Sequence, residues 1–206
     1  MHRDIKSANI VVGERGSFVR PDGTLSNYDR VLKLADFGLS RVMTFPPKPL
    51  TKEIATLNWR APEVILDNLK YNFAVDLWSI GVVIYEMLTG RLPFEGSSEI
   101  EYLLSIFRMK GTPVEQANLF FKNSPVLQLF AAKLPQFKSM GIRQAASRNN
   151  KDPRSKLVYG FDELIDALTM VDPSKRPSCS HALQRLGQIR ANYEVDMEGG
   201  CQYNNY

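Results

Sequence analysis

The segment HRDIKSAN, residues 2–9, is the most informative stretch of this 206-residue sequence. Two further short segments follow it along the chain, Asp36-Phe37-Gly38 and Ala61-Pro62-Glu63. Either tripeptide alone would carry little information, because three-residue matches occur by chance in many chains. Together the three segments fix about a dozen positions in one order, and an ordered set of that size is a specific signal.

The first segment resembles the catalytic loop of protein kinases, whose pattern H-R-D-x-x-x-x-N supplies a base and a metal ligand. The other two segments follow in the order that this family has. Over about residues 1–186 the chain is similar to the C-terminal lobe of a serine/threonine kinase. The resemblance implies a mainly α fold with short β-strands around the catalytic and Asp-Phe-Gly loops. No glycine-rich loop, Val-Ala-Ile-Lys strand or helix C occurs in the sequence, so the N-terminal lobe is expected to be absent.

The resemblance implies roles for four side chains in phosphoryl transfer from ATP. Asp4 would be the catalytic base that accepts the proton of the substrate hydroxyl, and Lys6 would bind the transferring phosphate. Asn9 and Asp36 would bind ATP through Mg²⁺, a hard cation that prefers oxygen ligands. For an isolated Asp or Lys, a solvated surface pair would be the better interpretation. The ordered motifs favour the catalytic one.

Three other residues match positions that support the kinase fold. Asp76, in Asp-Leu-Trp-Ser, resembles the residue of the central helix that accepts hydrogen bonds from the catalytic-loop backbone. Glu63 and Arg176 match a buried ion pair between the end of the activation segment and the last helices. His2 and Phe37 are expected to be structural rather than chemical groups.

The kinase subgroup is indicated by residues 51–60, TKEIATLNWR, which are similar to the cyclin-dependent kinase segment THEVVTLWYR. Within it, Thr56 and Arg60 would belong to the loop that receives the substrate residue after the phosphorylated one. Residues 111–113 (GTP) and 134–138 (LPQFK) resemble further stretches of the same subgroup. The resemblance implies protein substrates with Ser or Thr followed by proline, and a cyclin-like activator.

Thr51 stands at the place of the activating threonine in the similar cyclin-dependent segment, so we expect an upstream kinase to phosphorylate it. A phosphate there would add about −1.5 to −2 charges and three acceptor oxygens. Arg3 and Arg41 occupy positions where this family places two of its phosphate-binding arginines. An ordinary loop threonine is the alternative.

Composition is that of a globular protein with one core, with 44% hydrophobic and 23% charged residues. The longest apolar run near Trp78 is too short to span a bilayer as a helix, and no membrane partner is expected. The first residues are too polar for a secretory signal, so we expect an intracellular protein of the cytoplasm or nucleus. Cys179 and Cys201 are expected to be free thiols.

The net charge of +4 does not by itself indicate a nucleic-acid partner, because the 26 basic residues are spread among 22 acidic ones. The one local exception is a basic loop at residues 143–156. A nucleic-acid binder would need a clustered basic face with stacking aromatics, so no such partner is expected.

Periodicity and turn residues predict the order of the elements. Short strands at residues 10–12 and 31–35 flank an insert at 13–30, in which Pro21-Asp22-Gly23 predicts a small hairpin. The proline-rich residues 42–58 are expected to form a long loop.

Four helices are predicted in the rest of the chain. The first, from Asp76 to Leu88, has no polar face and is expected to be buried on all sides. The second has its apolar stripe at Ile100, Leu103, Leu104 and Phe107, with Ser98 and Glu101 as a capping box. The remaining helices are predicted at residues 161–168 and, in a short form, at 182–186. We expect a kinase-lobe domain over residues 1–190 and a disordered tail over 191–206.

Two functions are open at this point. The chain is either a serine/threonine kinase lobe, present as a fragment that would be inactive alone, or a catalytically inactive kinase-lobe scaffold or binding module. Retention of Asp4, Asn9 and Asp36 favours the first, because inactive relatives often lose at least one of these residues.

Overall fold

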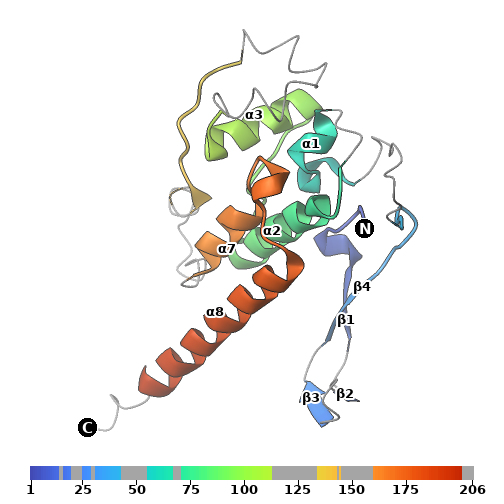
Figure 1. Ribbon diagram of the computed structural model, residues 1–206, viewed down its shortest axis with the longest axis vertical. Helices are drawn as coiled ribbons and strands as arrows, with labels where there is room; N and C mark the ends of the chain where they lie inside the picture. Colours follow the sequence, from blue (N-terminus) through green and yellow to red (C-terminus); the bar gives the residue numbers. More distant parts are fainter. Residues whose placement is uncertain are drawn as a thin grey trace.

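The computed structural model describes residues 1–13, 16–19, 25–28, 31–42, 55–66, 71–112, 134–142, 144 and 160–200. Its helices are α1 (Pro62–Ile65), α2 (Ala74–Thr89), α3 (Glu99–Lys110), α7 (Phe161–Leu168) and α8 (Cys179–Gly200). Single 3₁₀ turns are η1 (Ser7–Asn9), η2 (Leu57–Trp59) and η5 (Pro173–Lys175). The helices make the body of the molecule, and a narrow β ribbon extends from it (Figure 1). The expected mainly α fold with short strands is therefore present.

The ribbon consists of two antiparallel strand pairs, β1 (Ile10–Gly13) with β4 (Val31–Leu34) and β2 (Gly16–Val19) with β3 (Leu25–Tyr28) (Figure 1). The second pair confirms the hairpin predicted in the insert, although its turn, residues 20–24, lies outside the described residues. Where the first pair meets the body, the Ala35 amide donates to the Asn9 carbonyl oxygen at 2.8 Å. The ribbon thus sets the catalytic loop beside the Asp-Phe-Gly segment.

Helix α2 is the central helix, as its apolar sequence predicts. Its Gly81 lies so close to α7 that an added Cβ would stand 2.9 Å from the Leu168 Cβ, and only glycine allows this approach. The helix ends at Gly90, whose φ of 68° is the left-handed conformation that glycine favours. The prediction that every side is buried is wrong at the last turn, where Met87 is 65% exposed. Helix α7, η2 and η5 pack against α2 without enclosing that turn.

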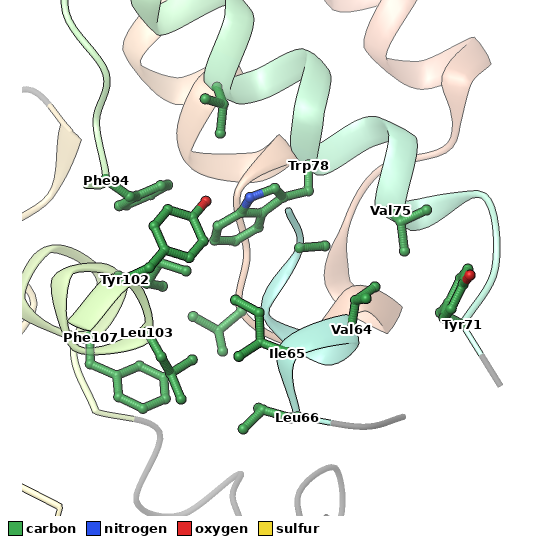
Figure 2. Close-up of a cluster of buried hydrophobic side chains, with 14 residues drawn as sticks. Val64, Ile65, Leu66, Tyr71, Val75, Trp78, Phe94, Tyr102, Leu103 and Phe107 are labelled. Carbon is green, nitrogen blue, oxygen red and sulfur yellow. The ribbon is translucent and has the colours of Figure 1, made fainter. Parts of the chain in front are cut away.

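The main core lies between α1, α2 and α3 (Figure 2). Trp78 of α2 stacks on Phe94 with ring centroids 5.2 Å apart, and Phe94 meets Tyr102 of α3 edge-on at 6.4 Å. Such aromatic contacts stabilise a core beyond the area that they bury. The cluster attaches α3 firmly to the central helix.

Helix α3 begins as predicted but is rotated relative to the predicted stripe. The Ser98 hydroxyl accepts the Glu101 amide at 3.2 Å, as in a capping box. The buried residues, however, are Tyr102, Leu103, Ile106 and Phe107, whereas Ile100 is 51% exposed. The rotation follows from Tyr102, because its ring fills the aromatic cluster and its hydroxyl reaches the carbonyls of the η2 segment.

Helix α8 is much longer than the short helix predicted at residues 182–186, and it extends from the body toward the C-terminus (Figure 1). Residues 191–200, predicted to be disordered, continue this helix to Gly200. No proline interrupts the segment, so the strongest helix breaker is missing from its sequence. Ile189, near the middle of α8, packs against Leu164 and Leu168 of α7 and attaches the helix to the body.

The predicted ion pair of Glu63 and Arg176 is present and buried. Arg176 Nη1 and Nη2 each donate to one carboxylate oxygen of Glu63 at 2.7 Å. The remaining donors reach carbonyl oxygens, with Nε to Met170 at 2.8 Å and Nη1 also to Ala74 at 2.8 Å. The guanidinium also lies 5.1 Å above the Trp78 ring. The pair therefore connects α1, α2 and the segment before η5.

Replacing Glu63 by Ala should lower the free energy of unfolding by about 3 to 5 kcal/mol, because Arg176 would stay buried without its counter-ion. Urea denaturation followed by circular dichroism measures the loss. The matched control is Glu163→Ala, which removes the exposed partner of Arg185 and should cost about 0 to 1 kcal/mol. Equal losses in the two variants would contradict the assignment.

Candidate active site

The catalytic loop is attached to α2 through one carboxylate. The backbone amides of His2 and Arg3 each donate to an oxygen of Asp76 at 2.8 Å. The His2 ring is also held, since Nε2 lies 3.1 Å from the Ala35 carbonyl oxygen and Nδ1 accepts the Asp4 amide at 3.3 Å. These contacts give His2 a structural position, as the sequence predicts. Phe37 packs edge-on against this ring at 4.9 Å.

Asp4 stands at the centre of a polar cluster. Its Oδ2 accepts from Lys6 Nζ at 2.9 Å and from Asn9 Nδ2 at 3.0 Å, and its Oδ1 accepts from the Thr56 amide at 3.2 Å. Lys6 Nζ also donates to Thr56 Oγ1 at 2.8 Å. The structure thus brings together four of the predicted site residues, three from the catalytic loop and one from a segment about fifty residues later.

The environment of Asp4 keeps its carboxyl group ionised. Burial alone would raise the pKa of Asp4, but the hydrogen bond and charge of Lys6, with the Thr56 amide and Asn9, outweigh burial and lower the pKa below its usual value. A proton acceptor must be deprotonated, and Asp4 meets this requirement at neutral pH.

Asn9 and Asp36 offer the oxygen atoms expected of a magnesium site. Asn9 uses its Nδ2 for bonds to the Asp4 carbonyl and carboxylate, so its Oδ1 takes no part in them. Asp36 is exposed, and its Oδ1 accepts the Gly38 amide at 3.2 Å. This donor set fits Mg²⁺, which usually binds one or two protein groups and completes its shell with phosphate and water. Among the described residues, no group of three or more His, Cys, Asp or Glu could hold a metal ion.

The segment before α1 has a strained backbone at Ala55, whose φ is 58°. A left-handed residue other than glycine costs about 1 to 3 kcal/mol and persists only where its surroundings hold it. Here Arg60 Nη2 donates to the Ala55 carbonyl oxygen at 3.1 Å. Farther along, the Ser79 hydroxyl of α2 donates to the Trp59 carbonyl at 2.8 Å. Residues 55–59 are therefore held by hydrogen bonds at both ends of the segment.

Sequence reasoning missed two acidic residues that contact this site. Glu86 of α2 accepts from the Ser7 hydroxyl at 3.2 Å and from Trp59 Nε1 at 3.3 Å, which links the catalytic loop to η2. Glu99 of α3 accepts from Arg60 Nη1 at 2.7 Å. Glu86 had a detectable signal, because Asp76 and Glu86 are the two charged residues of an otherwise uncharged helix.

The predicted phosphate-binding arginines lie on neighbouring segments. Arg3 is buried, with Nε donating to the Leu39 carbonyl at 2.6 Å and Nη1 to the Tyr71 hydroxyl at 3.0 Å. Arg41 is exposed, and its backbone amide donates to the Met1 carbonyl at 3.0 Å. Thr51, the predicted phosphorylation site, lies outside the described residues.

The comparison with known proteins agrees with this geometry. The family model for the protein kinase domain matches residues 1–186. The chain belongs to the protein kinase family. Within that family it is similar to the cyclin-dependent kinases, as the motifs around residues 51–60 indicate.

Two curated relatives carry that similarity. The chain is 36% identical over 184 residues to cyclin-dependent kinase G-2 of Oryza sativa. This match covers 89% of the chain and 24% of the relative. It is 34% identical over 185 residues to cyclin-dependent kinase 11 of Dictyostelium discoideum, covering 89% of this chain and 45% of the relative. The chain thus spans less than half the length of either relative.

A solved structure shows the same fold. It is the crystal structure of the yeast RNA Pol II CTD kinase CTDK-1 complex, in which the matched chain is 28% identical with a TM-score of 0.71. The match covers 89% of this chain and 54% of that chain.

None of the helices described for this kinase chain combines the length and the apolar character that a membrane-spanning helix needs.

Replacing Lys6 by Met should raise the pKa of Asp4, because burial would remain while the opposing charge and hydrogen bond are lost. A carboxyl ¹³C NMR titration measures the change. The sign follows from linkage: the lowered pKa makes Asp4 stabilise the fold at neutral pH, and this contribution is lost as the pH falls through the folded-state pKa. The control Lys33→Met, on exposed β4, should leave the Asp4 titration unchanged. An unaltered Asp4 titration in Lys6→Met would contradict the assignment.

Proposed function

We propose that residues 1–206 work as the C-terminal lobe of an ATP-dependent protein serine/threonine kinase that phosphorylates Ser or Thr followed by proline. The observation that carries the proposal is the cluster in which Asp4, Lys6, Asn9 and Thr56 meet. It joins a base, a cation, an amide and the substrate loop, the groups that phosphoryl transfer requires.

In this proposal the residues of the chain position the substrate hydroxyl and neutralise charge. Asp4 accepts the hydroxyl proton, and Asn9 fixes the carboxylate by donating to its Oδ2. Lys6 stands beside the same carboxylate and offers a positive charge to the transferring phosphate. Asn9 and Asp36 would hold Mg²⁺, and bound ATP with this ion would supply the phosphoryl group.

The preference for Ser and Thr is supported by the contact between Lys6 and Thr56. In the serine/threonine kinases that this sequence resembles, a lysine stands two residues after the base. Here that lysine bridges Asp4 and Thr56, with Nζ at 2.9 Å from the first and 2.8 Å from the second. The bridge orders the substrate loop against the catalytic base.

The preference for proline is supported by the Ala55 carbonyl. Arg60 already donates to this oxygen at 3.1 Å. In the proposed complex the residue after the phosphorylated one lies against this loop, where its backbone N–H would lack this acceptor. An unpaired N–H is costly when buried. Proline has no N–H to satisfy, so it loses nothing there.

Regulation and partners follow the same resemblance. We propose that an upstream kinase phosphorylates Thr51 and that Arg3 and Arg41 bind the phosphate, which would order the loop around the base. Relatives named cyclin-dependent kinases support a cyclin-like activator. An intracellular location, in the cytoplasm or nucleus, completes the proposal.

In a kinase that joins residues 1–206 to an ATP-binding N-terminal lobe, Asp4→Asn should lower kcat for a Ser-Pro peptide by about 10²- to 10⁴-fold. Radiolabelled phosphate transfer with Mg²⁺ measures this. The control is Glu95→Gln, an exposed residue that should leave kcat unchanged. Nucleotide binding without any transfer in the unaltered kinase, with its activator present, would instead favour the inactive scaffold.

Residues 1–206 alone should show negligible transfer. The sequence holds no glycine-rich loop, and positioning contributes about 7 to 11 kcal/mol in well-oriented systems. A general base supplies only about 3 to 5 kcal/mol. Robust Mg²⁺-dependent transfer by the purified chain, abolished by Asp4→Asn, would refute this expectation.

A further inference from the structure

Two residues of the candidate site have a left-handed backbone conformation although neither is glycine. Arg3 has a φ of 72° and Asp36 a φ of 60°. A residue in this conformation persists only where its surroundings hold it. The side chain of Arg3 connects the two, because its Nε donates at 2.6 Å to the carbonyl oxygen of Leu39, three residues after Asp36. The Arg3 guanidinium therefore supports the segment that carries Asp36.

The same guanidinium also contacts Tyr71, which lies three residues before α2. Its Nη1 donates to the Tyr71 hydroxyl at 3.0 Å, and Arg3 and Tyr71 are only 3% and 4% exposed. The Tyr71 ring packs at the edge of the main core cluster, so its hydroxyl is a fixed acceptor (Figure 2). A bond from a charged donor is stronger than a neutral one. Because the guanidinium is planar and its donors form a rigid fork, fixing Nη1 also sets the direction of Nε.

The turn that carries Asp36 gains little support from burial. Residues 36–39 are all exposed. Within the turn, the Asp36 Oδ1 accepts the Gly38 amide at 3.2 Å, and the Ser40 amide donates to the Phe37 carbonyl at 2.9 Å. The turn is thus compact, and its contacts with the catalytic loop place it. A shift of the Leu39 carbonyl would therefore move Asp36 as well.

We propose that Tyr71 is a positioning residue, which holds the Arg3 guanidinium on the Leu39 carbonyl and thereby keeps Asp36 in place to bind Mg²⁺. This inference rests on the proposed function, in which Asp36 is a metal ligand. Tyr71 acts on this ligand through Arg3 and Leu39. Removing its hydroxyl leaves the ring in the core but takes one acceptor from Arg3, so Asp36 is held less firmly and binds Mg²⁺ more weakly.

The test uses the active kinase that contains residues 1–206, its N-terminal lobe and its activator, with Mg²⁺ as the probe. Mg²⁺ is titrated in the presence of a non-hydrolysable ATP analogue. The NMR shift of the Gly38 amide, which donates to Asp36, gives the half-saturating concentration. In Tyr71→Phe this concentration should rise by about two- to tenfold, the range for one lost hydrogen bond. The Mg²⁺ dependence of kcat should shift by the same factor, whereas KM for the peptide should stay unchanged.

Two reference variants complete the test. Arg3→Lys keeps the charge but loses the fork, so it should raise the half-saturating Mg²⁺ concentration at least as much as Tyr71→Phe. Adding Tyr71→Phe to Arg3→Lys should have little further effect, because both replacements act through one guanidinium. The matched control is Tyr85→Phe, since Tyr85 is also 4% exposed but belongs to another core cluster, and it should leave Mg²⁺ binding unchanged. Thermal unfolding checks that each variant is folded.

The outcomes separate the two proposals. If Mg²⁺ does not shift the Gly38 amide of the unaltered kinase, the assignment of Asp36 as a metal ligand in the proposed function fails, and the inference fails with it. If the unaltered kinase binds Mg²⁺ and Tyr71→Phe binds it equally well, only the inference is overturned. A Tyr71→Phe variant that merely unfolds at a lower temperature would show a structural role and would overturn it too. Additive effects of Tyr71→Phe and Arg3→Lys would also do so.

Discussion

The site depends on one carboxylate, that of Asp76, which accepts the amides of His2 and Arg3 at 2.8 Å. Arg3 has a φ of 72°, a conformation that residues other than glycine rarely adopt. Such strain persists only where the surroundings compensate for it. Asp76, on the central helix α2, compensates for the strain at Arg3 by accepting its amide. Asp4 directly follows Arg3 in the chain, so the same contact also positions Asp4.

Helix α2 can perform this role because it is apolar and central. Its packing leaves few polar positions, and both of its acids point at the site: Asp76 binds the catalytic loop, and Glu86 joins Ser7 to Trp59. The buried pair of Glu63 and Arg176 then fastens α1 to the same helix. The segment around Asp4 and the segment before α1, the proposed catalytic and substrate loops, are thus both bound to α2.

The contacts that could be predicted from the sequence are those of residues that belong to recognisable motifs. The roles of Asp76 and the Glu63–Arg176 pair belong to ordered motifs, and both contacts are present. The contacts of Glu99 could not be predicted, because they depend on how α3 rotates, and the apolar spacing wrongly placed Ile100 in the core. The length of α8 was also missed, since a helix of low amphipathicity has weak periodicity after the residues that pack on α7.

Amide hydrogen exchange at His2 and Arg3 tests the central claim most directly, compared between the unaltered chain and Asp76→Asn. An asparagine keeps one acceptor oxygen and replaces the other with a donor, so the two amides can no longer share the group. The account predicts slow exchange at both amides in the unaltered chain and a rise of at least about tenfold at one or both of them in the variant, with the Trp78 amide still protected. Fast exchange in the unaltered chain, or equal rates in both proteins, would contradict it.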